Sequence, residues 1–177
     1  MDSAIMSFVQ QNLHNPLTNA VFPIITYLGE NGFIWFVLIL ALIVSKKHRH
    51  CGVMLLFSIS LAFLLGELVI KPVVARPRPF MDDPSVPLLI PPPGGFSFPS
   101  NHASSSFAVA TMLTFYHKRA GTAALLLAAL IAFSRIFLFV HYPTDVLAGA
   151  LLGILCASGI YFCAGCIEKK KGKKYFQ

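Results

Sequence analysis

The chain has 177 residues, of which 56% are hydrophobic and 12% are charged, and its formal net charge is +7. Several uncharged stretches are long enough for a transmembrane helix of roughly 20 residues, which excludes an ordinary soluble domain. The basic residues lie in short clusters between apolar runs, as in the cytoplasmic loops of membrane proteins, which argues against a nucleic-acid partner. We therefore predict one membrane-embedded domain over residues 1–177, an all-α polytopic membrane helix bundle with five to six transmembrane helices.

The predicted elements begin with an N-terminal interfacial segment, residues 1–30, which is only moderately apolar and holds two short helices. Five apolar spans follow it: Phe33 to Ser45, Cys51 to Ile70, about His102 to Tyr116, about Gly121 to Val140, and Asp145 to Cys166. A Pro-rich loop, residues 72–98, separates the second span from the third and has too many prolines for a helix or a central strand. The basic tail at residues 168–177 is expected to anchor the chain on anionic lipid.

The basic clusters follow the first, third and fifth spans, so they share one face of the membrane, which the positive-inside rule makes cytoplasmic. The opposite, extracytoplasmic face then receives the end of the second span, the start of the third and the break after the fourth. Polar residues that are unusual in apolar surroundings collect at that face: Lys71, Ser100, His102, Arg135, His141 and Asp145. We therefore predict one extracytoplasmic site and a cytoplasmic C-terminal tail.

Fixed positive charge at this site comes from Lys71, Arg78 and Arg135. Ionisable groups at membrane depth cost on the order of 2.5–3.5 kcal/mol each, so they need partners or a purpose. With Ser100 and the free N–H groups at the start of the third span, the three cations form a cradle suited to a phosphate. They would repel a divalent metal ion, so we predict metal-independent chemistry and no cofactor.

Two histidines and one aspartate complete the predicted chemistry. Asp145 follows His141 by one helical turn, and a carboxylate that accepts from one ring nitrogen leaves the other nitrogen oriented and more basic. That nitrogen could attack phosphorus. His102, across the cradle, could protonate the leaving oxygen and later take a proton from water.

Three separated motifs carry a family resemblance: Lys71, six residues, then Arg78-Pro79; Pro99-Ser100-Asn101-His102; and Ser134-Arg135, five residues, His141, three residues, Asp145. With this spacing, the stretch from about Glu67 to Gly149 resembles the type 2 phosphatidic acid phosphatase superfamily, which includes lipid phosphatases and is related to vanadium haloperoxidases. The compact layout is similar to that of bacterial enzymes that recycle undecaprenyl diphosphate. A six-helix core is the fold that the resemblance implies.

The resemblance implies that His141 is the nucleophile and forms a phosphohistidine, that Asp145 orients it, and that His102 is general acid and then base. It also implies a set of phosphate ligands: Lys71, Arg78, Ser100, Arg135 and the backbone amides near Asn101 and His102. The family commonly has glycine where this chain has Asn101, which tolerates left-handed geometry and keeps its backbone N–H. The larger side chain affects how closely a bulky substrate can approach.

The expected activity is hydrolysis of a terminal phosphate from a lipid phosphate or diphosphate, with undecaprenyl diphosphate as the best guess. Phosphatidylglycerophosphate and phosphatidic acid are alternative substrates, and phosphotransfer to another acceptor could use the same site. A non-enzymatic protein that binds phospholipid headgroups is a third class. The expected partners are the substrate lipid and the bilayer, and the oligomeric state is left open. Glu67 is expected to pair with Lys71 or Arg135, and Arg76 to contact headgroups or a substrate tail phosphate.

Overall fold

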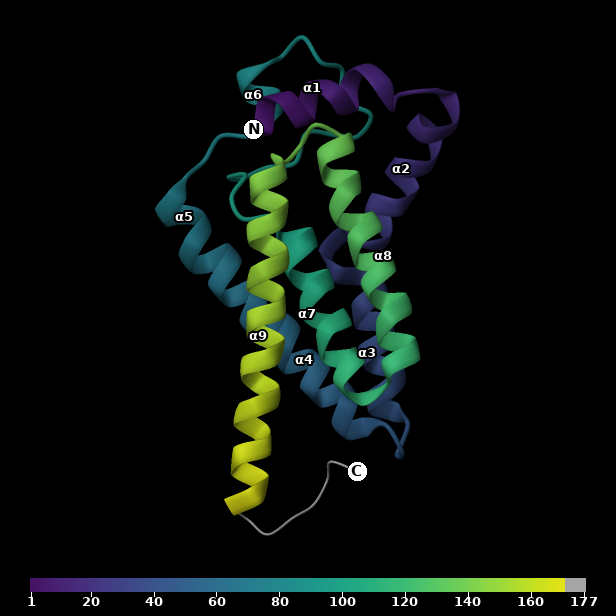
Figure 1. Ribbon diagram of the computed structural model, residues 1–177, viewed down its shortest axis with the longest axis vertical. Coiled ribbons are helices and arrows are strands. Elements are labelled where there is room, and N and C mark those ends of the chain that lie inside the picture. The colour runs from purple at the N-terminus through teal and green to yellow at the C-terminus, as the bar shows by residue number, and fades with distance from the viewer. Residues whose placement is uncertain (171–177) are drawn as a thin grey trace.

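The computed structural model describes residues 1–170, which form an all-α bundle without strands in that range (Figure 1). This agrees with the predicted fold class. The elements in chain order are α1 (Asp2–Asn12), α2 (Pro16–Leu28), the 3-10 turn η1 (Glu30–Gly32), α3 (Phe33–Val44), α4 (Arg49–Phe63), the π-helix η2 (Leu64–Ile70), α5 (Lys71–Val74), α6 (Pro79–Asp82), α7 (Asn101–Tyr116), α8 (Lys118–Phe137) and α9 (Pro143–Lys170). Most of the predicted basic tail lies outside the described residues.

Helix α7 is the centre of the bundle, and it packs against α4, α8 and α9. Its small residues let the neighbouring backbones come close. A Cβ atom placed on Gly153 of α9 would overlap the carbonyl oxygen of Ser104, and one on Gly149 would overlap that of Ser100. Close backbone approach at small residues is how helices pack in membranes. Trp35 of α3 adds a buried hydrogen bond, because its indole Nε1 donates to Ser106 Oγ at 2.8 Å.

Three helical segments of the described chain are long and apolar enough to cross a membrane: Arg49–Asp82, Lys118–Phe137 and Pro143–Ile167. A fourth candidate is the pair Pro16–Leu28 and Glu30–Val44, which is bent by 45°. The predicted count of five to six spans is therefore not established. Helix α7 has 16 residues, so it is too short to count among these candidates, which have at least 18 residues.

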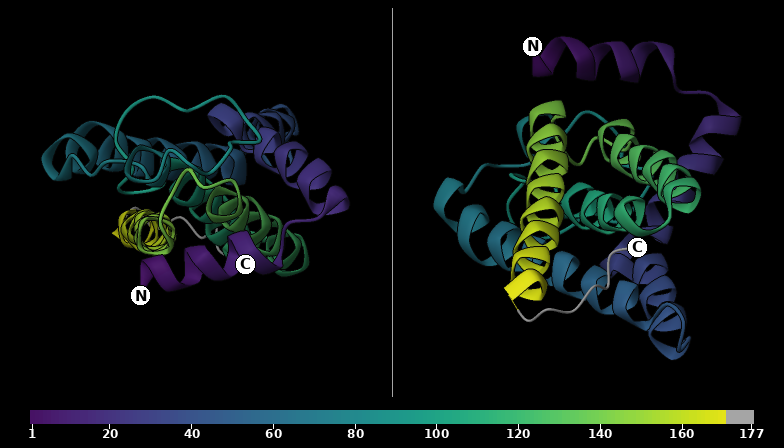
Figure 2. Two further views of the ribbon diagram at one scale, coloured as in Figure 1. Left: turned by 90° about the horizontal axis from the view of Figure 1, so that it is seen from above. Right: turned by 60° about the horizontal axis from the view of Figure 1, so that its bottom comes forward.

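Two short helices interrupt the Pro-rich segment, contrary to the prediction that it holds no helix. Helix α6 begins with Pro79, and α5 has Pro72 in its first turn. Proline is well tolerated at such positions because the first N–H groups of a helix have no partner within it. Helix α1 lies across the end of the bundle that carries α6 and the α8–α9 connection (Figures 1 and 2). The α3–α4 and α7–α8 connections, which carry the basic clusters, lie at the opposite end (Figure 1).

Candidate active site

A cavity of about 800 Å³ opens where α7 begins, and it is bounded by η1, α4, η2 and the α8–α9 connection. Six of the predicted site residues line it: Lys71, Arg78, Asn101, His102, Arg135 and His141. The remaining two, Ser100 and Asp145, are fully buried behind the wall. The structure thus brings together residues from all three sequence motifs, and both histidines face one cavity.

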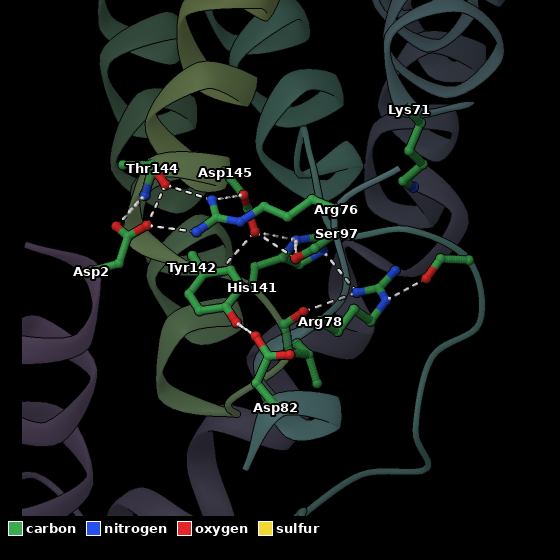
Figure 3. Close-up of polar contacts among 12 residues, drawn as sticks. Asp2, Lys71, Arg76, Arg78, Asp82, Ser97, His141, Tyr142, Thr144 and Asp145 are labelled. Carbon is green, nitrogen blue, oxygen red and sulfur yellow. Dashed lines mark hydrogen bonds and ion pairs between the residues drawn. The ribbon is translucent and has the colours of Figure 1, made fainter. Parts of the chain in front are cut away.

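His141 is 2% exposed and lies in the connection between α8 and α9. Its Nε2 atom is 3.2 Å from Arg78 Nη1 (Figure 3). An arginine can only donate, so Nε2 is the acceptor nitrogen and carries the free lone pair. The proton of the neutral ring therefore resides on Nδ1. Burial is the main cause that lowers the pKa of His141, and the positive charges of Arg135 and Arg78 act in the same direction.

A serine stands between His141 and Asp145. The distance from His141 Nδ1 to Asp145 Oδ2 is 3.6 Å, which is too long for a hydrogen bond. Ser97 Oγ lies 3.4 Å from Nδ1 and donates to Asp145 Oδ2 at 2.5 Å. Ser97 therefore lies between the two side chains, where its hydroxyl oxygen can accept a hydrogen bond from Nδ1–H while its own proton is donated to the carboxylate.

Asp145 itself is held by a network that reaches the first helix (Figure 3). Arg76 Nη1 donates to Asp145 Oδ1 at 2.7 Å, and Arg76 Nη2 donates to Asp2 Oδ2 at 2.8 Å. Asp2 also accepts from the backbone N–H and the hydroxyl of Thr144, at 3.1 Å and 2.6 Å. Arg76 thus contacts two carboxylates of the protein, and its expected contact with headgroups or a substrate tail phosphate stays a prediction. Partial burial raises the pKa of Asp2, but the hydrogen bonds from Thr144 and Arg76 outweigh it and hold that pKa below 3.8.

The three cations of the cradle are held differently. Arg78 donates to the carbonyl oxygens of Gly94, Gly95 and Val140 at 2.9–3.0 Å, which fixes the guanidinium against the Pro-rich loop. Lys71 Nζ pairs with Glu67 Oε2 at 2.5 Å, as expected for Glu67. Arg135 is 2% exposed and donates through Nη1 to Thr26 Oγ1 of α2 at 2.5 Å.

His102 occupies the first turn of α7 and faces a residue from another part of the chain. Its Nε2 atom is 3.5 Å from Glu30 Oε2, within ion-pair range, and Glu30 also lines the cavity. Glu30 belongs to η1, the break between α2 and α3. The segment predicted to be interfacial therefore forms part of the wall of the site.

Two of the polar atoms at this site, Ser100 Oγ and Arg135 Nε, are buried and have no hydrogen-bond partner within the described residues, and His102 Nε2 has only its 3.5 Å contact with Glu30. Buried polar groups are nearly always hydrogen-bonded in native proteins, so unpaired ones concentrated at one cavity indicate a missing ligand. A nearby excess of fixed cations makes that ligand an anion. The geometry thus describes an anion cradle with two imidazoles on its wall.

Residues 1–167, whose side chains the structure describes, contain no cluster of three or more His, Cys, Asp and Glu side chains that could hold a metal ion. That the reaction needs no metal ion stays a prediction, because only an activity measurement can test it.

Sequence reasoning missed several residues that contact the predicted ones: Asp2, Thr26, Glu30 and Ser97. None lies in the three motifs, and Asp2 and Thr26 meet their partners only through long-range packing. A signal did exist for Glu30, because an acidic residue flanked by Gly29 and Gly32 interrupts an apolar stretch. Ser97 lies two residues before the second motif, and nothing in the sequence alone marks it.

Comparisons with known proteins identify the family of the chain. The chain matches the PAP2 superfamily over residues 49–166. An undecaprenyl-diphosphatase of Sulfolobus acidocaldarius is 37% identical over 134 residues, which cover 73% of this chain and 64% of that protein. The present chain thus spans slightly less than two thirds of that relative's length.

Two solved structures have similar folds. LpxE of Aquifex aeolicus matches with a TM-score of 0.80 and 31% identity, over 90% of this chain and 94% of that chain. A PAP2-type phosphatidylglycerolphosphate phosphatase of Bacillus subtilis matches with a TM-score of 0.76 and 27% identity, over 99% of this chain and 87% of that chain. The matched range 49–166 contains every residue of the three motifs. From its sequence match, its fold and its apolar helices, this multi-pass membrane protein belongs to the PAP2 superfamily of membrane phosphatases.

Proposed function

We propose that the protein removes the terminal phosphate of a polyprenyl diphosphate, with undecaprenyl diphosphate as the best candidate, through a phosphohistidine intermediate. The observation that carries this proposal is that His102 and His141 line one cavity together with Lys71, Arg78 and Arg135. The relative from Sulfolobus acidocaldarius, an undecaprenyl-diphosphatase, supports the choice of substrate.

In the first step the terminal phosphate enters the cradle, and Arg78 exchanges its contact with His141 Nε2 for a phosphate oxygen. The freed lone pair of Nε2 attacks phosphorus, forming a P–N bond as the bond to the leaving oxygen breaks. His102 gives its proton to that oxygen. Positive charge that develops on His141 is stabilised by Ser97 and Asp145 behind Nδ1.

In the second step water takes the place of the leaving group. His102 accepts a proton from the water, whose oxygen attacks phosphorus while the P–N bond breaks. Inorganic phosphate is released, and His141 regains its lone pair. Each histidine ends the cycle in its starting protonation state, so no redox partner or metal is required by this scheme.

The apolar side of the cavity supports a lipid as the substrate. Phe36 of α3 together with Phe63 and Leu64 at the α4–η2 junction line the cavity, yet these side chains are 43–49% exposed on the outer surface of the bundle. An apolar chain in the bilayer could therefore contact this wall while its phosphate enters the cradle. By the positive-inside rule, we place this end of the bundle on the extracytoplasmic side and the C-terminus in the cytoplasm.

The test is phosphate release by purified protein from a side-by-side panel of undecaprenyl diphosphate, phosphatidylglycerophosphate and phosphatidic acid, in the presence of EDTA. We expect turnover without added metal, a preference for the diphosphate, and inhibition by vanadate. Loss of all activity in EDTA would refute metal independence. A preference for phosphatidylglycerophosphate would favour that substrate, consistent with the similarity to the Bacillus subtilis structure. Transfer of phosphate to an added alcohol in place of water would favour phosphotransfer.

A further inference from the structure

The contact between Glu30 and His102 is built by an unusual break in the chain. Gly29 has no room for a side chain, since a Cβ atom there would lie 2.6 Å from Ile131 Cγ2 and 3.1 Å from His102 Cδ2. Asn31 and Gly32 follow with φ angles of 50° and 72°, in the left-handed region that most residues avoid. The backbone between α2 and α3 is thus fitted against the imidazole of His102, and this fit brings the Glu30 carboxylate into the cavity.

The two ring nitrogens of His102 have different surroundings. Nε2 is buried and lies 3.5 Å from Glu30 Oε2, which leaves Nδ1 as the ring nitrogen that does not face this carboxylate. A carboxylate opposite one nitrogen of a histidine favours a proton on that nitrogen and leaves the other for chemistry. The arrangement therefore selects Nδ1 as the atom that exchanges a proton with the substrate.

The charges around His102 show why such a carboxylate matters. The groups that face it are Glu30 from η1, Arg135 from α8 and Arg78 from the segment before α6. Lys71 lines the same cavity, but it is paired with Glu67, and His141 is neutral and buried. The two arginines disfavour a protonated imidazole, which is the form that a general acid needs. Glu30 is the acidic group that opposes them at His102.

We propose that Glu30 is the positioning residue of His102: its carboxylate holds the ring by Nε2, directs Nδ1 at the leaving oxygen, and keeps the ring charged for the first step. This inference rests on the proposed function and deepens it. Each catalytic histidine then has its own carboxylate, Asp145 for the nucleophile and Glu30 for the acid.

The experiment replaces Glu30 by Gln, which keeps the shape and removes the charge. With a lipid monophosphate, whose leaving alkoxide needs a proton, we expect kcat to fall roughly tenfold to hundredfold. With p-nitrophenyl phosphate, whose leaving group needs no proton, we expect the pre-steady-state burst to change less than about threefold. The alkaline limb of kcat/KM should move to lower pH, and Glu30→Asp should restore part of the rate.

Two controls separate this role from a structural one. Asp83→Asn removes a negative charge from an exposed loop residue and should leave the rates and the pH profile unchanged. In a double-mutant cycle, Glu30→Gln should add little to the loss caused by His102→Gln, because both act through one ring. An equal loss with both leaving groups, an unmoved pH profile or additive losses would overturn the proposal.

The failure of this inference and the failure of the proposed function can be told apart. If the unmodified protein releases no phosphate from any lipid of the panel, the proposed function fails. The contact can still be read by 15N NMR of the histidine rings in detergent micelles. We expect the neutral His102 ring to carry its proton on Nε2, and Glu30→Gln to alter that signal while leaving His141 unaffected. A His102 ring protonated on Nδ1 in the unmodified protein would overturn the inference.

Discussion

The Ser97 hydroxyl contacts both His141 Nδ1 and the Asp145 carboxylate. Removing this hydroxyl therefore tests whether these contacts support the nucleophile. In Ser97→Ala the Nδ1 proton loses its nearest acceptor at 3.4 Å, and Asp145 Oδ2 loses a 2.5 Å hydrogen bond. Asp145 keeps the backbone N–H of Tyr142 at 2.9 Å and the guanidinium of Arg76 at 2.7 Å, so the carboxylate stays in place.

The size of the effect follows from these contacts. A buried hydrogen bond to a charged group contributes about 1.5–3 kcal/mol, which corresponds to roughly a 10- to 150-fold change in rate if it is felt fully in the transition state. The carboxylate lies only 3.6 Å from Nδ1, and a small shift could restore a direct bond. We therefore expect kcat to fall about 10- to 50-fold, far less than the roughly 10³- to 10⁴-fold loss expected for Asp145→Asn.

The assay is steady-state phosphate release, with vanadate inhibition measured in parallel to show that the cradle is intact. Ser97→Thr retains a hydroxyl at the same position and serves as the matched variant, with a smaller loss expected than for alanine. Unchanged kcat in Ser97→Ala, with Asp145→Asn still inactive, would refute a role for this hydroxyl between the two side chains.

Three further predictions concern stability, each measured by thermal unfolding in detergent. Asp2→Asn should destabilise the fold by about 1–3 kcal/mol, because it breaks the charged hydrogen bonds that tie α1 to Arg76 and to Thr144 of α9; an unchanged midpoint would show that α1 is not held this way. Burial places the folded pKa of His141 below its ordinary 6.5, so the unfolded chain binds the proton first. Stability should therefore be complete above about pH 6.5 and fall as the pH drops below it, whereas His141→Gln should show a flatter dependence; equal slopes would contradict the assignment. Gly153→Ala should cost about 1–3 kcal/mol, because its Cβ meets the backbone of α7. Gly159→Ala is the matched control, with no atom within 4 Å of its Cβ, and an equal loss there would refute the packing argument.

Much of the site was predictable because its chemistry is local in sequence. The cations and histidines of the three motifs were identified as polar residues in apolar surroundings. Because successive spans cross the membrane in alternate directions, the sequence also predicted that these residues lie at one end of the bundle. The structure places Lys71, Arg78, His102, Arg135 and His141 around one cavity. Helix boundaries were also close, since proline and charged clusters terminate the helices.

The remaining contacts depend on packing that no local pattern encodes. Thr26 reaches Arg135 because α2 packs on α8, and Glu30 reaches His102 because Gly29 lets two helices approach. Helix α7 was predicted as a membrane span because its residues are apolar and small. Its central place among α4, α8 and α9 was not predictable, because it depends on packing between helices.

The most direct test of the proposed reaction is to trap the covalent intermediate. Protein incubated with a lipid diphosphate labelled in its terminal phosphate is denatured in alkali, where phosphohistidine survives, and digested for mass spectrometry. The proposal predicts label on His141, increased in His102→Ala because water is no longer activated, and absent in His141→Ala. Label on another residue, or full turnover by His141→Ala, would contradict it.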